Sequence, residues 1–209
     1  QNAHYHLGHC YLKLNQKAQA LNAFKNASEM SFDSEIQKDA FLNYAKLSYD
    51  IGNPYKSSSD VLQDFVDAYP DASETNFVES LIVNAYLQFK DYQGAIDYYE
   101  TQKLLKDEQY QQLLLLRGFE LFTEKKHKLA LTFFDQTVSM YDDPKIKAKA
   151  LFWKAETLAE LYDFKAATYH YRDFLNSENS KHLTEYADGF YGLAYSLFQQ
   201  KNYKDAITY

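Results

Sequence analysis

The chain repeats itself about every 37 residues, and this period decides what it can fold into. In five copies a small residue or Val is followed three positions later by Tyr or Leu and twelve positions later by Ala. A sixth copy, 43–62, fits if one residue is inserted near Pro54, which puts Ser58 in the Ala position. The small position holds Gly8, Ala45, Val83, Gly118, Ala155 and Ala194. A period of this length is typical of stacked helix hairpins, because each unit needs its neighbours to bury its apolar face.

Composition agrees with helices and excludes several classes of protein. Only 6 Gly and 3 Pro occur in 209 residues, too few turn-forming residues for a sandwich or barrel of many strands. No apolar run approaches the roughly 18 residues of a membrane span, so we expect no membrane insertion. The net charge is −7 and only two basic residues are Arg, which disfavours nucleic acid as a partner. A single Cys excludes an internal disulfide and leaves the compartment open.

The apolar periodicity and the polar breaks between apolar stretches predict twelve helices. We expect them at 2–14, 17–30, 36–51, 55–69, 74–89, 92–106, 109–124, 127–141, 145–161, 164–176, 183–200 and 203–209. The predicted fold is an all-α, right-handed solenoid of about five and a half hairpins forming one domain. Its repeats are expected at about 1–34, 35–72, 73–107, 108–143, 144–180 and 181–209, the last one truncated.

These residues resemble the tetratricopeptide repeat (TPR) family, which carries a small residue and Tyr in its first helix and Ala and Phe or Tyr in its second. The first copy is the densest, with Leu7, Gly8, Tyr11, Ala20, Phe24 and Ala27. The resemblance implies a solenoid that binds a protein or peptide partner and needs no cofactor. The long period and the phrase FVDAYPDASE (65–74) are similar to TPR proteins of Gram-negative cell envelopes. That similarity implies a periplasmic or envelope location, with the cytoplasm as the alternative. A chain that starts without Met and stops within a repeat is expected to be a fragment of a longer protein.

The candidate binding surface is the face formed by the first helix of each hairpin. Positions −3, +1 and +4 from the small residue are expected to point toward it, and eight of these 18 positions are aromatic, whereas the chain average of 17% would give about three. The eight are Tyr5, Tyr49, Phe119, Phe122, Phe152, Tyr191, Tyr195 and Phe198. They form an aromatic groove in one interpretation, because such rings give large contact area and dominate binding hot spots. In the other they pack against neighbouring helices.

The charges expected near this groove add to −2, from Lys13, Lys46 and Lys149 against Asp39, Asp50, Glu156, Glu160 and Asp188. The peptide-carboxylate clamp that the family resemblance suggests needs clustered Lys and Asn, so such binding is disfavoured. Glu156 and Glu160 at the edge of the groove favour a neutral or basic partner.

Motifs for chemistry are scarce. His4, His6, His9 and Cys10 cluster in the first helix, but a stable metal site needs three or four ligands with supporting partners, so we interpret them as packing and surface residues. The sequence contains no phosphate-binding loop, HExxH, GxSxG or paired CxxC. We therefore expect a scaffold without catalytic activity, metal or cofactor. The alternatives are a spacer in a long solenoid, and an enzyme or sugar-binding protein whose site lies in another part of the parent chain.

Overall fold

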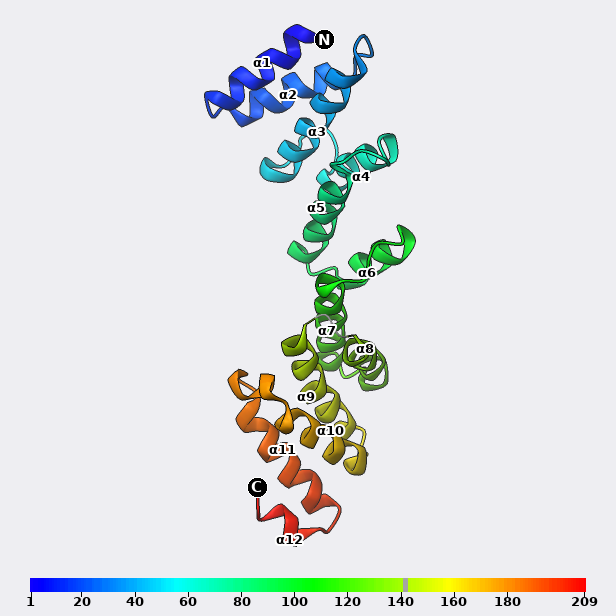
Figure 1. Cartoon of the computed structure of the whole chain (residues 1–209), viewed down its shortest axis with the longest axis vertical. Helices are drawn as coiled ribbons and strands as arrows, with labels where there is room; N and C mark the ends of the chain where they lie inside the picture. The colour runs from blue at the N-terminus through cyan, green and yellow to red at the C-terminus, as the bar shows by residue number, and fades with distance from the viewer. Residues whose placement is uncertain (141–142) are drawn as a thin grey trace. The chain divides into compact units, whose positions relative to one another are not determined.

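The computed structural model describes residues 1–140 and 143–209, and the elements in these ranges are helices. They are α1 (Asn2–Lys13), α2 (Lys17–Ser28), α3 (Ser34–Ile51), α4 (Ser58–Ala68), α5 (Thr75–Gln88), α6 (Tyr92–Thr101), α7 (Glu108–Thr123), α8 (His127–Ser139), α9 (Pro144–Glu160), α10 (Phe164–Asn176), the 3₁₀ helix η1 (Glu178–His182), α11 (Tyr186–Gln199) and α12 (Tyr203–Ala206) (Figure 1). The all-α prediction is confirmed.

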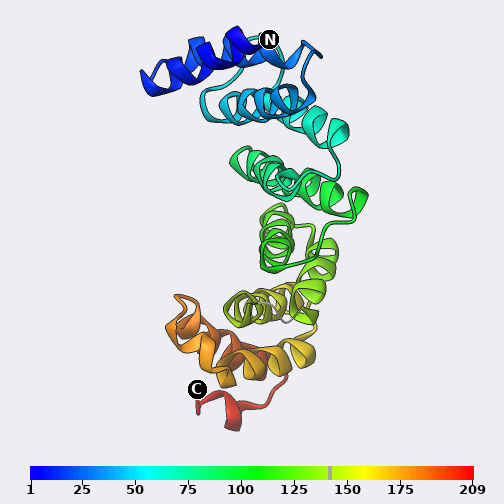
Figure 2. The same cartoon turned by 45° about the horizontal axis from the view of Figure 1, so that its top comes forward.

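The chain divides into two compact units, 1–91 and 92–209. In the first, each helix from α1 to α5 packs on the next, and α3 also packs on α1 and α5. In the second, α6 to α12 pack in sequence, α9 also touches α7 and α11, and Figure 2 shows α9 and α10 side by side. Contacts between first helices of successive hairpins are the packing of an α-solenoid. The expected repeat boundaries remain a prediction.

Small residues permit the close crossing of the two helices of a hairpin. A Cβ added to Gly8 would lie 2.8 Å from the ring of Phe24, and one added to Gly118 would lie 2.7 Å from the ring of Phe134. Both pairs are 16 residues apart, and both rings are fully buried. Ala155 is completely buried and Gly118 is buried too, so the small position lies inside the structure in both copies.

Each hairpin turn has a residue with positive φ seven positions after the small residue. These residues are Asn15, Gly52, Lys90, Lys125, Tyr162 and Lys201. In five turns the next N–H donates to a carbonyl five residues earlier; for example, Asp163 N–H donates to the Leu158 carbonyl at 2.9 Å. This is the hydrogen bond of a Schellman motif, which satisfies carbonyls left unpaired at a helix C-terminus. The recurrence confirms the register of the five copies that share this hydrogen bond, and in the second copy Gly52 has the same turn position.

The second copy contains a larger insertion than we expected. Its second helix, α4, begins 13 residues after Ala45, whereas in the other copies the interval is nine, so four residues are inserted rather than one. The Ala position is therefore not occupied by Ser58, and the expected helix start at 55 is wrong. The Asn53 side-chain amide donates to the hydroxyls of Tyr44 and Ser48, each at 2.8 Å, and so holds the longer turn against α3.

Aspartates begin three of the first helices. Asp33, Asp107 and Asp143 lie at the N-caps of α3, α7 and α9, and each carboxylate accepts N–H groups of the first turn. Such a cap typically stabilises a helix by about 1 kcal/mol, because it satisfies donors that have no partner within the helix.

Two of these N-caps are each connected to the preceding hairpin by a glutamine side chain. Gln111 is fully buried; its amide donates to the Thr137 carbonyl at 3.3 Å and its oxygen accepts the Asp143 N–H at 2.8 Å. Gln1 does the same with the Met30 carbonyl and the Asp33 N–H. Each glutamine lies seven residues before a small residue, so the polar contact between hairpins repeats with the helices.

Other helix ends differ from the expected ones. Helix α6 stops at Thr101 instead of 106, and a positive φ at Lys103 follows it. The 3₁₀ helix at 178–182 was not expected, and α11 begins at 186 rather than 183. The predicted end of the eighth helix at 141 lies outside the described residues. The residues at 102–106 and 178–182 are mostly polar, and polar residues are common both in the last turn of a helix and in the loop after it. The sequence pattern therefore could not locate these helix ends to within a few residues.

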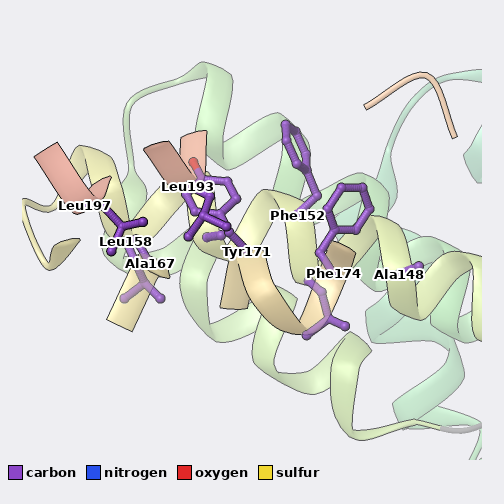
Figure 3. Packing of buried hydrophobic residues seen from close by; sticks show 10 residues of the cluster. Ala148, Phe152, Leu158, Ala167, Tyr171, Phe174, Leu193 and Leu197 are labelled. Carbon is purple, nitrogen blue, oxygen red and sulfur yellow. The ribbon is translucent and has the colours of Figure 1, made fainter. Parts of the chain in front are cut away.

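The largest part of the core described for the second unit lies between α9, α10 and α11. Buried side chains from these helices include Phe152, Ala155, Tyr171, Phe174 and Leu193. Figure 3 shows the rings of Phe152 and Phe174 next to each other, and their centroids are 5.3 Å apart. Because the core fills the space between helices of successive hairpins, it fixes which residues of α9 and α11 remain at the surface.

We predict that Gly118→Ala lowers the free energy of unfolding. Ala favours a helix by about 1 kcal/mol over Gly, but overpacking against the Phe134 ring costs about 1 to 3 kcal/mol, so the loss should win. Urea denaturation should show that adding Phe134→Leu gives a smaller loss than the sum of the two single changes, because the smaller side chain makes room. Gln136→Ala, on the exposed side of the same helix as Phe134, is the matched control and should change little. If the losses of stability from Gly118→Ala and Phe134→Leu simply add in the double variant, the two residues are not in direct contact and the proposed crossing is wrong.

Candidate functional site

The structure leaves most of the predicted aromatic residues at the surface. Tyr191 is 75% exposed, Phe198 55%, Tyr195 44% and Phe119 41%. Phe122 is partly buried, and so are Tyr5 and Tyr49 in the first unit. Seven of the eight candidates thus have solvent-accessible rings, and their role in binding stays a prediction.

Phe152 is the exception. It is 4% exposed and contacts Phe174 and Tyr171 in the core of the second unit, so it cannot line a surface groove. Its neighbour Trp153 is only partly buried, and sequence reasoning missed it because it lies outside the three positions tested in each repeat. One residue of displacement along a helix rotates a side chain by about 100°, which separates a core position from a surface position.

Trp153 on α9 contacts two aromatic residues of α7. Its ring lies 4.8 Å from Phe119 and 5.3 Å from Phe122, both in edge-to-face geometry. The ring of Phe122 also contacts His127 at the start of α8. Aromatic pairs of this kind stabilise the structure by about 0.5 to 1.5 kcal/mol beyond the area they bury. Phe119 and Phe122 therefore have a structural role as well as surface exposure.

A second group of rings surrounds a cleft of about 420 Å³ between α9, α10 and α11. Tyr162, in the turn before α10, contacts Phe164 at 6.0 Å; Phe164 contacts Tyr195 at 6.1 Å; and Tyr195 is stacked on Tyr191 at 6.4 Å. Tyr162 and Phe164 were not predicted, because only first helices were tested. The sequence does contain a signal, since the position of Tyr162 holds Asn, Gly or Lys in the other copies.

Two carboxylates also line this cleft. Glu156 and Glu160 project from α9, and the Tyr171 hydroxyl donates to Oε1 of Glu156 at 2.5 Å. Burial raises the pKa of the Glu156 carboxyl above its usual value, the Tyr171 hydrogen bond lowers it, and the charges of Glu160 and Asp188 raise it again. The same burial raises the pKa of the Tyr171 hydroxyl, so this hydroxyl remains a hydrogen-bond donor.

Gly192 on α11 makes this arrangement possible. A Cβ added there would lie 2.6 Å from the Tyr171 oxygen, so only glycine lets the Tyr171 ring pass close to α11. The phenol can then reach from the core to Glu156 at the cleft. A buried residue of the core thereby sets the position of a carboxylate at the surface.

The candidates in the first unit have other surroundings. The Tyr5 hydroxyl donates to Asp39 at 2.6 Å, and this bond, with burial and the charge of Asp39, raises the pKa of Tyr5 to about 12. Tyr49 borders a hollow of about 320 Å³ that Phe77 and Leu81 of α5 also line. The Lys46 ammonium lies 5.1 Å above the Phe77 ring at this hollow. This hollow lies between first helices, as the groove hypothesis expects, but four of its apolar residues were not among the candidates: Leu12, Leu47, Phe77 and Leu81.

The histidine cluster of α1 is arranged for packing. His9 lies against the rings of Tyr5 and Phe24, and Cys10 is exposed. Within the described residues, no three or more His, Cys, Asp or Glu side chains are placed to hold a metal ion. Across the same residues, none of the helices combines the length and apolarity needed to cross a membrane.

Comparison with known proteins bears on the first hairpin most directly. Residues 1–34, which include the Gly8–Phe24 crossing and end just after the Asp33 cap, match the family described as tetratricopeptide repeat. The first hairpin is therefore similar to one tetratricopeptide repeat. A solved structure, the TPR2AB-domain:pHSP90 complex of yeast Sti1, is 19% identical with a TM-score of 0.42, over 99% of this chain and 86% of that chain. No curated protein matches the sequence.

We predict that Glu156→Gln stabilises the second unit near neutral pH. A carboxyl whose pKa is raised by folding binds more protons in the folded state, so the free energy of unfolding falls as pH rises from about 4.3 through the raised pKa. Gln can still accept the Tyr171 hydrogen bond but cannot ionise. Urea denaturation should therefore show the variant more stable near neutral pH, with the difference shrinking on acidification.

Glu124→Gln is the matched control, because Lys126 lowers the pKa of the Glu124 carboxyl. Its linkage has the opposite sign, so this variant should not gain stability near neutral pH. A Glu156→Gln variant that is less stable than wild type near neutral pH would contradict the burial argument.

Proposed function

We propose that the chain is a non-enzymatic scaffold that binds a segment of a partner protein on the first-helix surface of its second unit. The observation that carries the proposal is the set of exposed rings on α11, Tyr191, Tyr195 and Phe198, next to the 420 Å³ cleft. Tetratricopeptide repeats are interaction modules, and residues 1–34 match that family.

Energetics support binding at these rings. Large apolar side chains left in water forgo roughly 25 cal/mol for each Å² that a partner could cover. Tyr is also enriched at binding hot spots, since it offers a wide contact area with few rotatable bonds. Three such side chains on one helix face, beside a cleft, are more than the isolated apolar residues that any surface carries.

A spacer remains the alternative function, and one observation favours it. Phe152 is buried, and Trp153 packs against Phe119 and Phe122, so this part of the first-helix face is filled by the chain's own side chains. Binding should therefore concentrate on α9 and α11, with α7 contributing less.

The resemblance of 65–74 to cell-envelope repeats supports the further proposal of a periplasmic location, with the cytoplasm as the alternative.

A random peptide library displayed on phage tests the scaffold function. We expect the immobilised chain to enrich a family of related sequences. Tyr191→Ala with Tyr195→Ala should abolish this enrichment while helical circular dichroism stays the same. Phe77→Ala, an exposed ring in the first unit, is the matched control and should retain it. The spacer interpretation replaces the scaffold if the wild-type chain enriches no sequence family, and the site is wrong if the double variant enriches the same family.

A further inference from the structure

We propose that the cleft between α9, α10 and α11 binds an arginine or lysine side chain of the partner segment, with its cationic group between the Tyr191–Tyr195 rings and the carboxylates of Glu156 and Glu160. This inference rests on the proposed scaffold function and deepens it by naming the chemistry that the site recognises. A cleft of about 420 Å³ is within the size range of ligand pockets, roughly 300 to 1,000 Å³.

The aromatic rings that line the cleft are suited to binding a cation. The rings of Tyr162, Phe164, Tyr195 and Tyr191 follow one another at centroid distances of 6.0, 6.1 and 6.4 Å. A ring attracts a cation placed within about 6 Å of its centroid, because the π face is negative. Tyr191 and Tyr195 are nearly parallel, at 13°, and accessible to solvent, so a planar guanidinium can stack on an exposed ring face.

The carboxylates that line the cleft are suited to the charge of a cation. Glu156 and Glu160 line the cleft, and Asp188 on α11 lies close enough to raise the pKa of Glu156. Among the described residues that line the cleft, there is no lysine, arginine or histidine. A cationic ligand would relieve the repulsion among these carboxylates and could donate charge-assisted N–H hydrogen bonds to their oxygens.

The core holds the carboxylate in place before a ligand arrives. Tyr171 is 1% exposed and its hydroxyl donates to Oε1 of Glu156. Gly192 provides the space for this phenol. A carboxylate fixed by a buried partner loses little freedom on binding, which raises affinity for a cation of the right geometry.

The backbone at Tyr162 adds a second line of support. Tyr162 has φ of 62° and is 82% exposed, in the turn position where other copies carry Asn, Gly or Lys. The left-handed region is unfavourable for a bulky side chain. The other copies fill this turn position with Asn, Gly or Lys, so the turn itself does not require an aromatic residue, and here the aromatic residue lines the cleft.

Three short blocked peptides test the proposal: Ac-Ala-Arg-Ala-NH₂, Ac-Ala-Lys-Ala-NH₂ and Ac-Ala-Gln-Ala-NH₂. Each is titrated into the whole chain with selectively labelled tyrosine, and the ring signals of Tyr191 and Tyr195 are followed by NMR. We expect the arginine and lysine peptides to shift both signals in a saturable way and the glutamine peptide to shift neither. Equal response to all three peptides, or no response to the basic ones, would overturn the proposal.

Variants assign the response to the cleft. Glu156→Gln and Tyr191→Leu should each weaken binding of the arginine peptide about tenfold, as the loss of one charged hydrogen bond or one ring contact implies. Tyr162→Gly should weaken it too, while the melting temperature stays level or rises. Glu124→Gln, outside the cleft, should bind like wild type. Tetramethylammonium, which cannot donate a hydrogen bond, should bind more weakly than the arginine peptide; tighter binding would overturn the assignment to a basic side chain.

The peptide library separates this inference from the scaffold function. A basic residue at a fixed position in the enriched sequences, lost from the selection with Glu156→Gln, supports the cleft assignment. A sequence family without a fixed basic residue overturns the cleft assignment and leaves the scaffold function intact. A library that yields no family at all overturns the scaffold.

Discussion

The close crossing of two helices at a small residue and an aromatic ring is the contact on which the rest of this structure depends. At Gly8 and Gly118 the helix backbone touches the ring of a Phe placed 16 residues later, with no space for a methyl group. This contact fixes the distance and rotation of the paired helices. The turn between the paired helices has its positive-φ residue at the same interval in each hairpin, and in five of the six the second helix then begins two residues later.

Contacts between hairpins use a wider range of chemistry. Gln1 and Gln111 connect the end of one hairpin to the N-cap of the next by polar bonds, whereas α10 and α11 meet through Tyr171, Phe174, Gly189 and Gly192. The second kind has a consequence for the surface. A ring that needs glycine opposite it can extend past the neighbouring helix, and at Tyr171 it reaches a carboxylate at the edge of the cleft.

The candidate site was only partly predictable for this reason. Tyr191 and Tyr195 are on the exposed face that their positions in the repeat indicated. Phe152 occupies an equivalent position on α9 but is buried, because Phe174 and Tyr171 of the following helix extend over it. Predicting exposure from positions on one helix face takes no account of side chains on the neighbouring helix. These side chains differ in size from one copy to the next, so equivalent positions differ in burial. The four-residue insertion before α4 escaped for a similar reason, since its hydrogen bonds to Tyr44 and Ser48 replace the usual turn.

The sequence by itself determined the helix hairpins, the register of five of the six copies and the buried small residues, because periodicity and turn chemistry act over a few residues along one chain. It also placed Glu156 and Glu160 near the aromatic face. Only the tertiary structure decided that these carboxylates share a cleft with Tyr162, Phe164 and Tyr191, which come from three different segments. The physical reason is that a cleft is the space left between packed side chains, and its shape depends on Gly192 and Tyr171, which meet across two helices.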